Sequence, residues 1–198
     1  MSSVTRRDFL KSVALGGGTL VFIPIAKNFP VIFPDEPNQS APLEDIFIEG
    51  IVGELKENEL QVKDDKDDKI KYTIRITPST RLWKGDLTTL DKVETGDFLY
   101  GLGTLVENGV IEVKKLWVNI VNFYVKATFD SDTWLNGQLL TLDGSPTENF
   151  FKIEIDDKTV VNESPGQKLV LGPDGLIQII GLMRRDETVM ATKIWTAG

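Results

Sequence analysis

Paired carboxylates are the side chains of this sequence that could take part in catalysis most directly. The candidates are Asp156 with Asp157, Asp130 with Asp132, and Glu44 with Asp45. Two carboxyl groups can act as acid and base, as in glycoside hydrolysis, only when they face each other across a cleft. Neighbouring residues of a strand point to opposite faces, so we expect these pairs in turns or on the surface. The carboxylates therefore do not predict an enzyme.

Two residue types that often carry out chemistry are missing, because the sequence has no Cys and no His. It therefore cannot form disulfides, thiolate metal sites or Cys-ligated iron–sulfur clusters. The commonest general base and zinc ligand is also lacking. The acidic run at 64–69 lacks the spacing and the central glycine of an EF-hand, so it predicts a solvated hairpin turn and not a calcium loop. We expect no bound cofactor and no metal site.

The net charge argues against nucleic acid as a partner. It is −8 at pH 7, and it becomes −10 when residues 1–26, with three basic residues and one acidic residue, are set aside. Binding to phosphates requires a basic face that releases counterions. The length of 198 residues and the 41% of hydrophobic residues indicate a globular protein with one substantial core or two small ones.

The N-terminus carries residues typical of a targeting signal. Residues 5–11 read Thr-Arg-Arg-Asp-Phe-Leu-Lys and precede an uncharged, glycine-containing stretch at 12–26. This pattern resembles the twin-arginine (Tat) export signal, and the matching residues are Arg6, Arg7, Phe9, Leu10 and Lys11. The resemblance implies that the Tat translocase exports the folded protein. We therefore expect the protein in the periplasm, at the cell surface or outside the cell.

The fate of this signal segment is open between cleavage and anchoring. Pro24 and Ala26 form a poor site for signal peptidase, which prefers small residues three positions and one position before the cut. The uncharged stretch is shorter than the roughly 20 residues of a membrane-spanning helix, although residues 29–33 could extend it. Cleavage after Ala26 is slightly favoured over anchoring in a membrane through residues 12–33.

Residues 27–45 predict an extended linker. Four prolines fall within this span, at positions 30, 34, 37 and 42, and proline prevents both helix formation and strand pairing. The linker also contains an apolar cluster, made of Phe29, Val31, Ile32 and Phe33. This cluster is either a flank of the signal or a segment that docks on the membrane or on the folded domain.

A repeat organises the rest of the chain. Residues 103–117 and 181–195 share Gly at the first position, Lys at the thirteenth and Trp at the fifteenth, and several positions between them exchange like for like. Such similarity at a fixed period indicates one hairpin design used twice.

The strands predicted around these hairpins give an all-β fold. Alternation at 70–76 and β-branched runs elsewhere predict five strands in the first half, with a short helix over 87–93 capped by Asp86. The second half predicts five strands in the same order without a helix. Two tandem OB-like barrels follow, with one interleaved β-sandwich as the alternative. The expected divisions are a signal segment at 1–26, a linker at 27–45 and barrels at 46–121 and 122–198.

Over residues 46–196 this layout resembles small exported OB-like β-barrel repeats of uncharacterised bacterial families. The resemblance rests on turn and strand residues, such as a threonine after the third strand, at Thr80 and Thr159, and Gly96-Asp97 before the fourth. The second copy departs from the pattern, because it has Asp174-Gly175 in place of Gly-Asp.

The tryptophans are candidates for either packing or binding. Trp117 and Trp195 end equivalent strands, so we expect them to fill the two barrels. Trp83 and Trp134 fall in predicted loops, and these two residues are the candidates for a surface that contacts a partner.

Two functional hypotheses follow from the sequence. The first is a non-catalytic envelope protein that serves as a structural or protein-interaction module, and it needs nothing beyond the observed features. The alternative is an accessory subunit of an exported redox complex that provides the Tat signal for a partner. A carbohydrate-binding module or a carboxylate-based hydrolase is a distant third.

Replacing both Arg6 and Arg7 by lysine should leave the protein in the cytoplasm. Lysine keeps the charge but not the planar guanidinium geometry that the export receptor is expected to read. Fractionation of cells that produce the double variant or the unaltered protein measures the effect. Unimpaired export of the double variant would contradict the assignment of a Tat signal.

Overall fold

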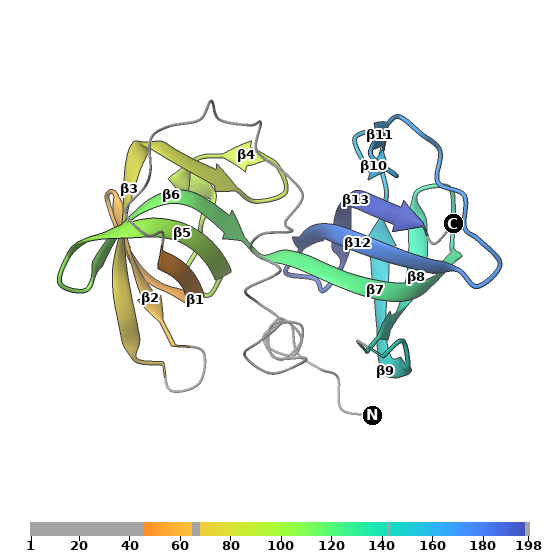
Figure 1. Cartoon of the computed structure of the whole chain (residues 1–198), viewed down its shortest axis with the longest axis horizontal. Coiled ribbons are helices and arrows are strands. Elements are labelled where there is room, and N and C mark those ends of the chain that lie inside the picture. The colour runs from red at the N-terminus through yellow and green to blue at the C-terminus, as the bar shows by residue number, and fades with distance from the viewer. Residues whose placement is uncertain (1–45, 65–67, 142, 197–198) are drawn as a thin grey trace. The chain divides into compact units, whose positions relative to one another are not determined.

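The computed structural model describes residues 46–64, 68–141 and 143–196 (Figure 1). The described chain is all-β apart from one short 3-10 helix, which confirms the predicted fold class. It divides into two compact units after Asn119. Each unit has its own sheet, so the alternative of one interleaved sandwich is wrong. Residues 1–26, which resemble an export signal, and the proline-containing residues 27–45, which are predicted to be a linker, lie outside the described residues. Among the described residues, no helix is long and apolar enough to cross a membrane.

The first unit is a closed barrel of five strands (Figure 1). They are β1 (Ile46–Lys56), β2 (Glu59–Lys63), β3 (Ile70–Trp83), β5 (Phe98–Glu107) and β6 (Val110–Val118). The order around the ring is β1-β2-β3-β6-β5, and β5 pairs again with β1. All neighbours are antiparallel except β3 and β6, which are parallel. This arrangement is the OB-like barrel that the sequence predicts.

Alternating apolar residues on these strands form the core of the barrel. Ile48, Leu60, Ile74 and Leu99 come from four different strands and are fully buried. They belong to one hydrophobic cluster. Burying a side chain of this size contributes about 1.5–3 kcal/mol, so the inward faces of the strands dominate the stability of the barrel.

The second unit repeats this ring. Its strands are β7 (Ile120–Phe129), β8 (Trp134–Leu140), β9 (Pro146–Glu154), β12 (Leu176–Met183) and β13 (Val189–Thr196). They pair in the order β7-β8-β9-β13-β12, and β12 returns to β7. The short strand β10 (Val160–Val161) continues the parallel pairing with β13 and carries β11 (Ser164–Pro165) at its other edge. β9 and β10 together therefore take the place of β3.

The repeated glycine marks the same bulge in both barrels. The pairing of β5 with β6 shifts between Leu102 and Gly103, and that of β12 with β13 shifts between Ile180 and Gly181. A Cβ atom on Gly103 would lie 2.4 Å from the carbonyl oxygen of Glu112, and one on Gly181 would lie 2.3 Å from that of Met190. Glycine is required because the two strands approach too closely for a side chain.

On the other side of β6 and of β13, a threonine hydroxyl donates a hydrogen bond to the strand. The Thr80 hydroxyl donates to the carbonyl oxygen of Val113 at 2.6 Å, and the Thr159 hydroxyl donates to that of Ala191 at 3.0 Å. Each hydroxyl oxygen also accepts a backbone N–H from three residues earlier in the chain. The correspondence between the two threonines that the sequence suggests is therefore present in the geometry.

The predicted helix over 87–93 is wrong. The region contains strand β4 (Leu87–Thr88), which pairs with the end of β3, and a single 3-10 turn η1 (Leu90–Lys92). The Asp86 carboxylate accepts the N–H of Leu87 at 2.7 Å, at the start of β4. Asp86 therefore closes a tight turn between two strands and does not cap a helix.

Replacing Gly103 or Gly181 by alanine should destabilise the protein by about 2 kcal/mol or more, because the added methyl group would collide with backbone that cannot move aside. Gly109→Ala is the matched control in the β5–β6 hairpin. Gly109 has a φ of 77° with no atom within 4 Å of an added Cβ, so its cost should be about 1 kcal/mol. Denaturant titrations measure the difference, and equal costs for Gly103→Ala and Gly109→Ala would contradict the close approach.

Candidate functional site

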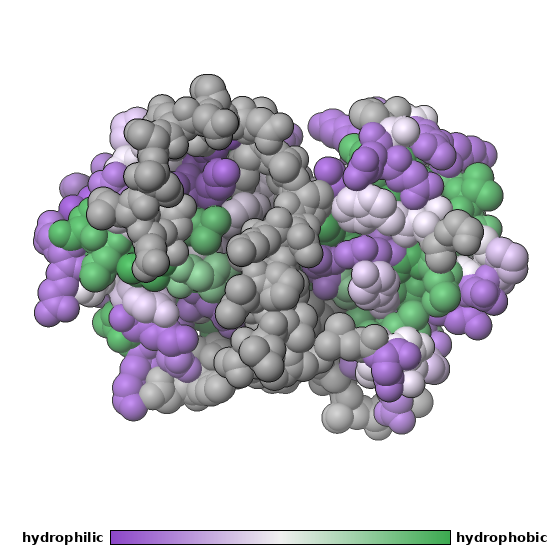
Figure 2. Space-filling model, in the orientation of Figure 1, coloured by the Kyte–Doolittle hydropathy of each residue, from purple (hydrophilic) through white to green (hydrophobic). Residues whose placement is uncertain are grey.

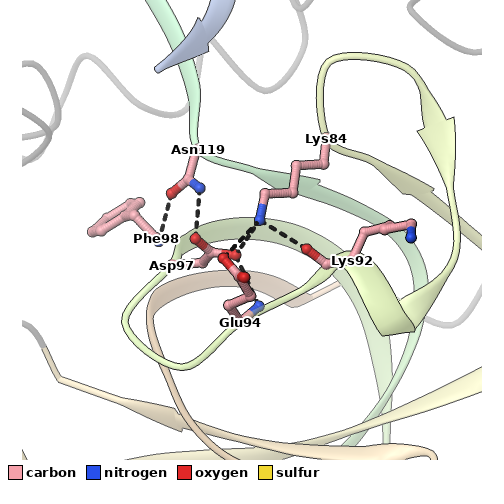
Figure 3. Close-up of polar contacts among 6 residues, drawn as sticks. All are labelled: Lys84, Lys92, Glu94, Asp97, Phe98 and Asn119. Carbon is pink, nitrogen blue, oxygen red and sulfur yellow. Dashed lines mark hydrogen bonds and ion pairs between the residues drawn. The ribbon is translucent and has the colours of Figure 1, made fainter. Parts of the chain in front are cut away.

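A buried polar cluster holds one end of the first barrel (Figure 3). The carboxylate of Asp97 is 1% exposed and accepts the side-chain amide of Asn119 at 2.8 Å. Its second oxygen accepts the Lys84 ammonium at 2.7 Å and the backbone N–H of Glu94 at 2.9 Å. The Asn119 oxygen in turn accepts the N–H of Phe98 at 2.9 Å. Three separate segments of the first unit are joined in this way, namely residue 84, residues 94–98 and residue 119.

The contacts of this cluster indicate a structural role. Besides Asp97, the Lys84 ammonium contacts the Lys92 carbonyl oxygen at 2.8 Å and the Glu94 carboxylate at 3.7 Å. A buried ion pair is tolerated when further hydrogen bonds satisfy both charges, as they do here. Lys84 and Asp97 hold each other and the surrounding backbone, so they connect β3, the 94–97 turn and the end of β6.

The second barrel lacks this cluster. The carbonyl oxygen of Asp97 accepts the N–H of Val52 at 2.8 Å, and at the equivalent position the carbonyl oxygen of Gly175 accepts the N–H of Ala127 at 2.7 Å. A Cβ atom on Gly175 would lie 2.4 Å from the Ala127 oxygen. The backbone contact is kept, while the carboxylate has no room. Because Asp174-Gly175 replaces Gly96-Asp97, the second barrel has no aspartate carboxylate at the position that binds Lys84 and Asn119 in the first.

The carboxylate pairs do not assemble an acid–base site. Hydrogen bonds from Lys152 and Asn136 lower the pKa of Asp130, which is opposite to the shift that a general acid requires. The Asp156 carboxylate accepts the N–H of Lys158 at 3.0 Å within a turn. Glu44 and Asp45 lie outside the described residues. Among 46–64, 68–141 and 143–196, no group of three or more acidic side chains could hold a metal ion.

The tryptophans do not lie where the sequence places them. Trp83 is the last residue of β3 and is 2% exposed, so the expectation that it lies in an exposed loop is wrong. Trp134 opens β8 and is half-buried. They belong to different units. Trp117 lies between Leu116 and Val118, which both point into the core, so alternation places Trp117 on the outer side of the barrel and not inside it.

Trp195 also faces outward and lines a groove on the second barrel. It pairs across β13 and β12 with Gln178, which pairs across β12 and β7 with Tyr124. The groove has a volume of about 430 Å³, within the range of ligand sites. Its other lining residues are Leu140, Thr141, Gly144, Leu176, Ile177 and Thr196. In the space-filling view, hydrophobic residues reach the surface of each barrel between hydrophilic ones (Figure 2).

The groove combines exposed aromatic surface with a fixed amide. Tyr124 is 51% exposed and Leu176 is 38% exposed. The Gln178 amide donates to the Asn122 side-chain oxygen at 2.9 Å, which sets its orientation between Tyr124 and Trp195. Aromatic side chains with one apolar face and one polar end are enriched at binding surfaces.

Charged residues of both signs lie beside the groove. Asp143 stands between the lining residues Thr141 and Gly144 and accepts the Thr141 hydroxyl. The Lys193 ammonium lies 5.9 Å from the centre of the Trp195 ring, in cation–π range. Lys126 is exposed, is the cross-strand neighbour of Leu176 and has no ion-pair partner among the residues that the structure describes. None of the described lining residues is acidic. The groove itself is therefore lined by apolar and neutral polar side chains, with two lysines and one aspartate beside it.

The repeat shows how the two barrels differ at the place of this groove. Leu176 and Gln178 take the places of Phe98 and Tyr100, which are nearly buried and whose rings pack edge to face with centres 5.0 Å apart. Tyr100 pairs with Trp117 as Gln178 pairs with Trp195. Two smaller side chains in place of two rings leave open volume. The alternating run from Phe123 to Val125 could have indicated an outward Tyr124. The repeated glycine marks the bulge that turns Trp195 outward, but a strand glycine alone does not say which residue of the partner strand is the extra one.

No known protein family matches this chain, and no curated protein is significantly similar to it in sequence. The function must therefore be inferred from its own residues.

The Lys84–Asp97 pair generates a prediction about stability. Asp97→Asn should cost about 3 kcal/mol, because it leaves the lysine ammonium beside a neutral amide in a largely buried position. The double variant with Lys84→Met should cost less than the sum of the single costs, since both charges are then removed. Denaturant titrations of the variants measure this coupling.

Lys92→Met is the control, because only the backbone carbonyl of Lys92 joins the cluster. Its cost should be below about 0.5 kcal/mol. Strict additivity of Asp97→Asn and Lys84→Met would show that the two side chains do not act as a pair.

Proposed function

We propose that the protein is an exported, non-catalytic module that binds a partner protein through the groove of its second barrel. The single observation that carries the proposal is the outward row of Tyr124, Gln178 and Trp195 on three neighbouring strands. Tyrosine and tryptophan supply a large share of the energy at protein interfaces when a partner covers them.

The surroundings of this row support binding more than reaction. The groove is lined by aromatic, aliphatic and neutral polar side chains, and none of its described lining residues is an acid or a base. The Thr141 hydroxyl donates to the Asp143 carboxylate, and this hydrogen bond lowers the pKa of Asp143, which makes it a weaker base. Seven of the groove's nine lining residues stand on strands of the closed ring, and the other two, Thr141 and Gly144, lie in the turn after β8. A partner therefore pays little to order this face, which favours recognition.

Export accords with this role. The residues that resemble a Tat signal, Arg6 and Arg7 foremost, send a folded protein across the cytoplasmic membrane, and a module that folds before export can present a finished groove on the other side. The partner is then an envelope or extracellular protein. If the captured partner carries a redox centre, the protein serves as the accessory subunit of an exported redox complex.

Two substitutions at the groove test the proposal. Trp195→Ala removes the aromatic wall, and Gln178→Tyr fills the groove as Tyr100 does in the first barrel. Both should reduce capture of the partner by cross-linking in intact cells at least ten-fold, because an interface anchor contributes about 1.4 kcal/mol or more. Mass spectrometry of the cross-linked species identifies the partner.

The control is Phe150→Ala, which removes an aromatic ring that is 67% exposed and lies outside the groove. It should leave capture unchanged. Trp134→Ala, measured alongside, tests the remaining sequence-based candidate for the partner surface. Equal capture by Trp195→Ala and the unaltered protein would overturn the proposal, as would retention of an envelope polysaccharide in place of a protein.

A further inference from the structure

We propose that the side chains of Lys84 and Asn119 join in an amide bond, with Asp97 moving protons between the two nitrogen atoms and ammonia leaving. The buried cluster of the first barrel brings an amine, a carboxamide and a carboxylate together (Figure 3). Such a transfer requires a nucleophile, an acyl group with a leaving nitrogen, and a base beside the nucleophile. The inference concerns the first barrel alone and does not use the groove of the second.

Asp97 is placed to act on both nitrogen atoms. One of its carboxylate oxygens lies 2.7 Å from the Lys84 Nζ atom, and the other lies 2.8 Å from the Asn119 Nδ2 atom. A group that transfers protons must lie within about 2.6–3.2 Å of the atom it serves. A single carboxylate therefore separates the two nitrogen atoms and reaches both.

The Asn119 carboxamide is held and polarised by Phe98. The Asn119 side-chain oxygen accepts the backbone N–H of Phe98 at 2.9 Å, and the Asn119 backbone N–H donates to the Phe98 carbonyl oxygen at 2.7 Å. Asn119 has a φ of 53°, in the left-handed region, and these two hydrogen bonds hold it there. Addition to the carboxamide carbon places negative charge on the side-chain oxygen, and a fixed N–H donor stabilises that charge.

The cluster excludes water from the reacting groups. Asp97 and Asn119 are each 1% exposed, and the Lys84 side chain is 18% exposed. Water therefore does not compete with the amine for the carboxamide carbon. The ring does not need this carboxylate, because Gly175 keeps the same backbone hydrogen bond in the second barrel without one.

The reaction is balanced within three side chains. Asp97 takes a proton from the Lys84 ammonium, which replaces the ion pair by two neutral groups. The Nζ lone pair forms a bond to the Asn119 Cγ atom, and Asp97 gives its proton to Nδ2. The Cγ–Nδ2 bond then breaks and ammonia leaves. Asp97 takes the extra proton from Nζ, so it ends protonated beside a neutral amide.

The bond would close the parallel side of the ring covalently. Lys84 directly follows β3 and Asn119 directly follows β6, and these two strands are the parallel pair of the first barrel. A cross-link between distant residues restricts the unfolded chain. The sequence has no cysteine, so an amide bond is a cross-link that this chain can form where a disulfide is not.

Peptide mass spectrometry of the protein purified from the cells that make it tests the inference. After trypsin digestion, residues 82–92 and 116–126 should appear as one branched peptide that has lost one ammonia. Lys84→Arg keeps the positive charge but removes the amine, so it should abolish this peptide. Asp97→Asn keeps both reacting side chains but removes the base, so it should lower the yield of the peptide at least about ten-fold.

Lys71→Arg is the control, because Lys71 forms an ion pair with Asp64 at 3.0 Å in the same barrel, outside the cluster. It should leave the branched peptide unchanged. Circular dichroism shows which of the compared proteins are folded. Separate peptides from the folded, unaltered protein would overturn the inference. So would a branched peptide that has lost water and contains residues 93–114, since the bond would then be on Asp97.

Discussion

The last strand of each barrel, β6 or β13, carries a bulge, and the rest of the architecture depends on how the two strands beside it pair with the bulged backbone. On the antiparallel side of Val113 and Ala191, a glycine of the neighbouring strand lets the two backbones approach. On the parallel side, a threonine hydroxyl donates a hydrogen bond to the carbonyl oxygen of Val113 or Ala191. The ring closes because the glycine leaves room for the bulged backbone and the threonine satisfies its carbonyl oxygen. A closed ring leaves none of its five strands with an unpaired edge, and it fixes which side chains point outward.

The sequence predicts most of the fold because the bulge recurs with its own residue types. The shared glycine, the shared threonine and the strand alternation predict two copies of one five-stranded unit, and the ring order confirms it. Prediction fails where strands are interrupted. The bulge at 77–80 hides the continuity of β3, so the strand that resumes at Arg81 and ends at Trp83 reads as part of a loop.

The orientation of the tryptophans fails for a related reason. Without a bulge, Trp117 would share a face with Ile111 and Val113, which are both in the core. The extra residue, Lys114, reverses the alternation, so Leu116 and Val118 point inward and Trp117 points outward. The same shift after Ala191 turns Trp195 outward. The repeated glycine marks the bulge but does not identify the extra residue, and that residue decides whether an aromatic ring points into the core or outward.

The two barrels share the same ring of strands but carry different side chains at equivalent positions. The first barrel carries a buried charge pair, and at the outer side of its closing hairpin it packs Phe98 against Tyr100. The second has glycine in place of the buried aspartate, and Leu176 with Gln178 in place of the two rings. None of these three changes disturbs the bulge or the threonine hydrogen bond, which are both present in the second barrel. The residues that close the ring are therefore independent of the residues that form its outer surface. One copy of the barrel can carry a groove at the place where the other copy carries two packed rings.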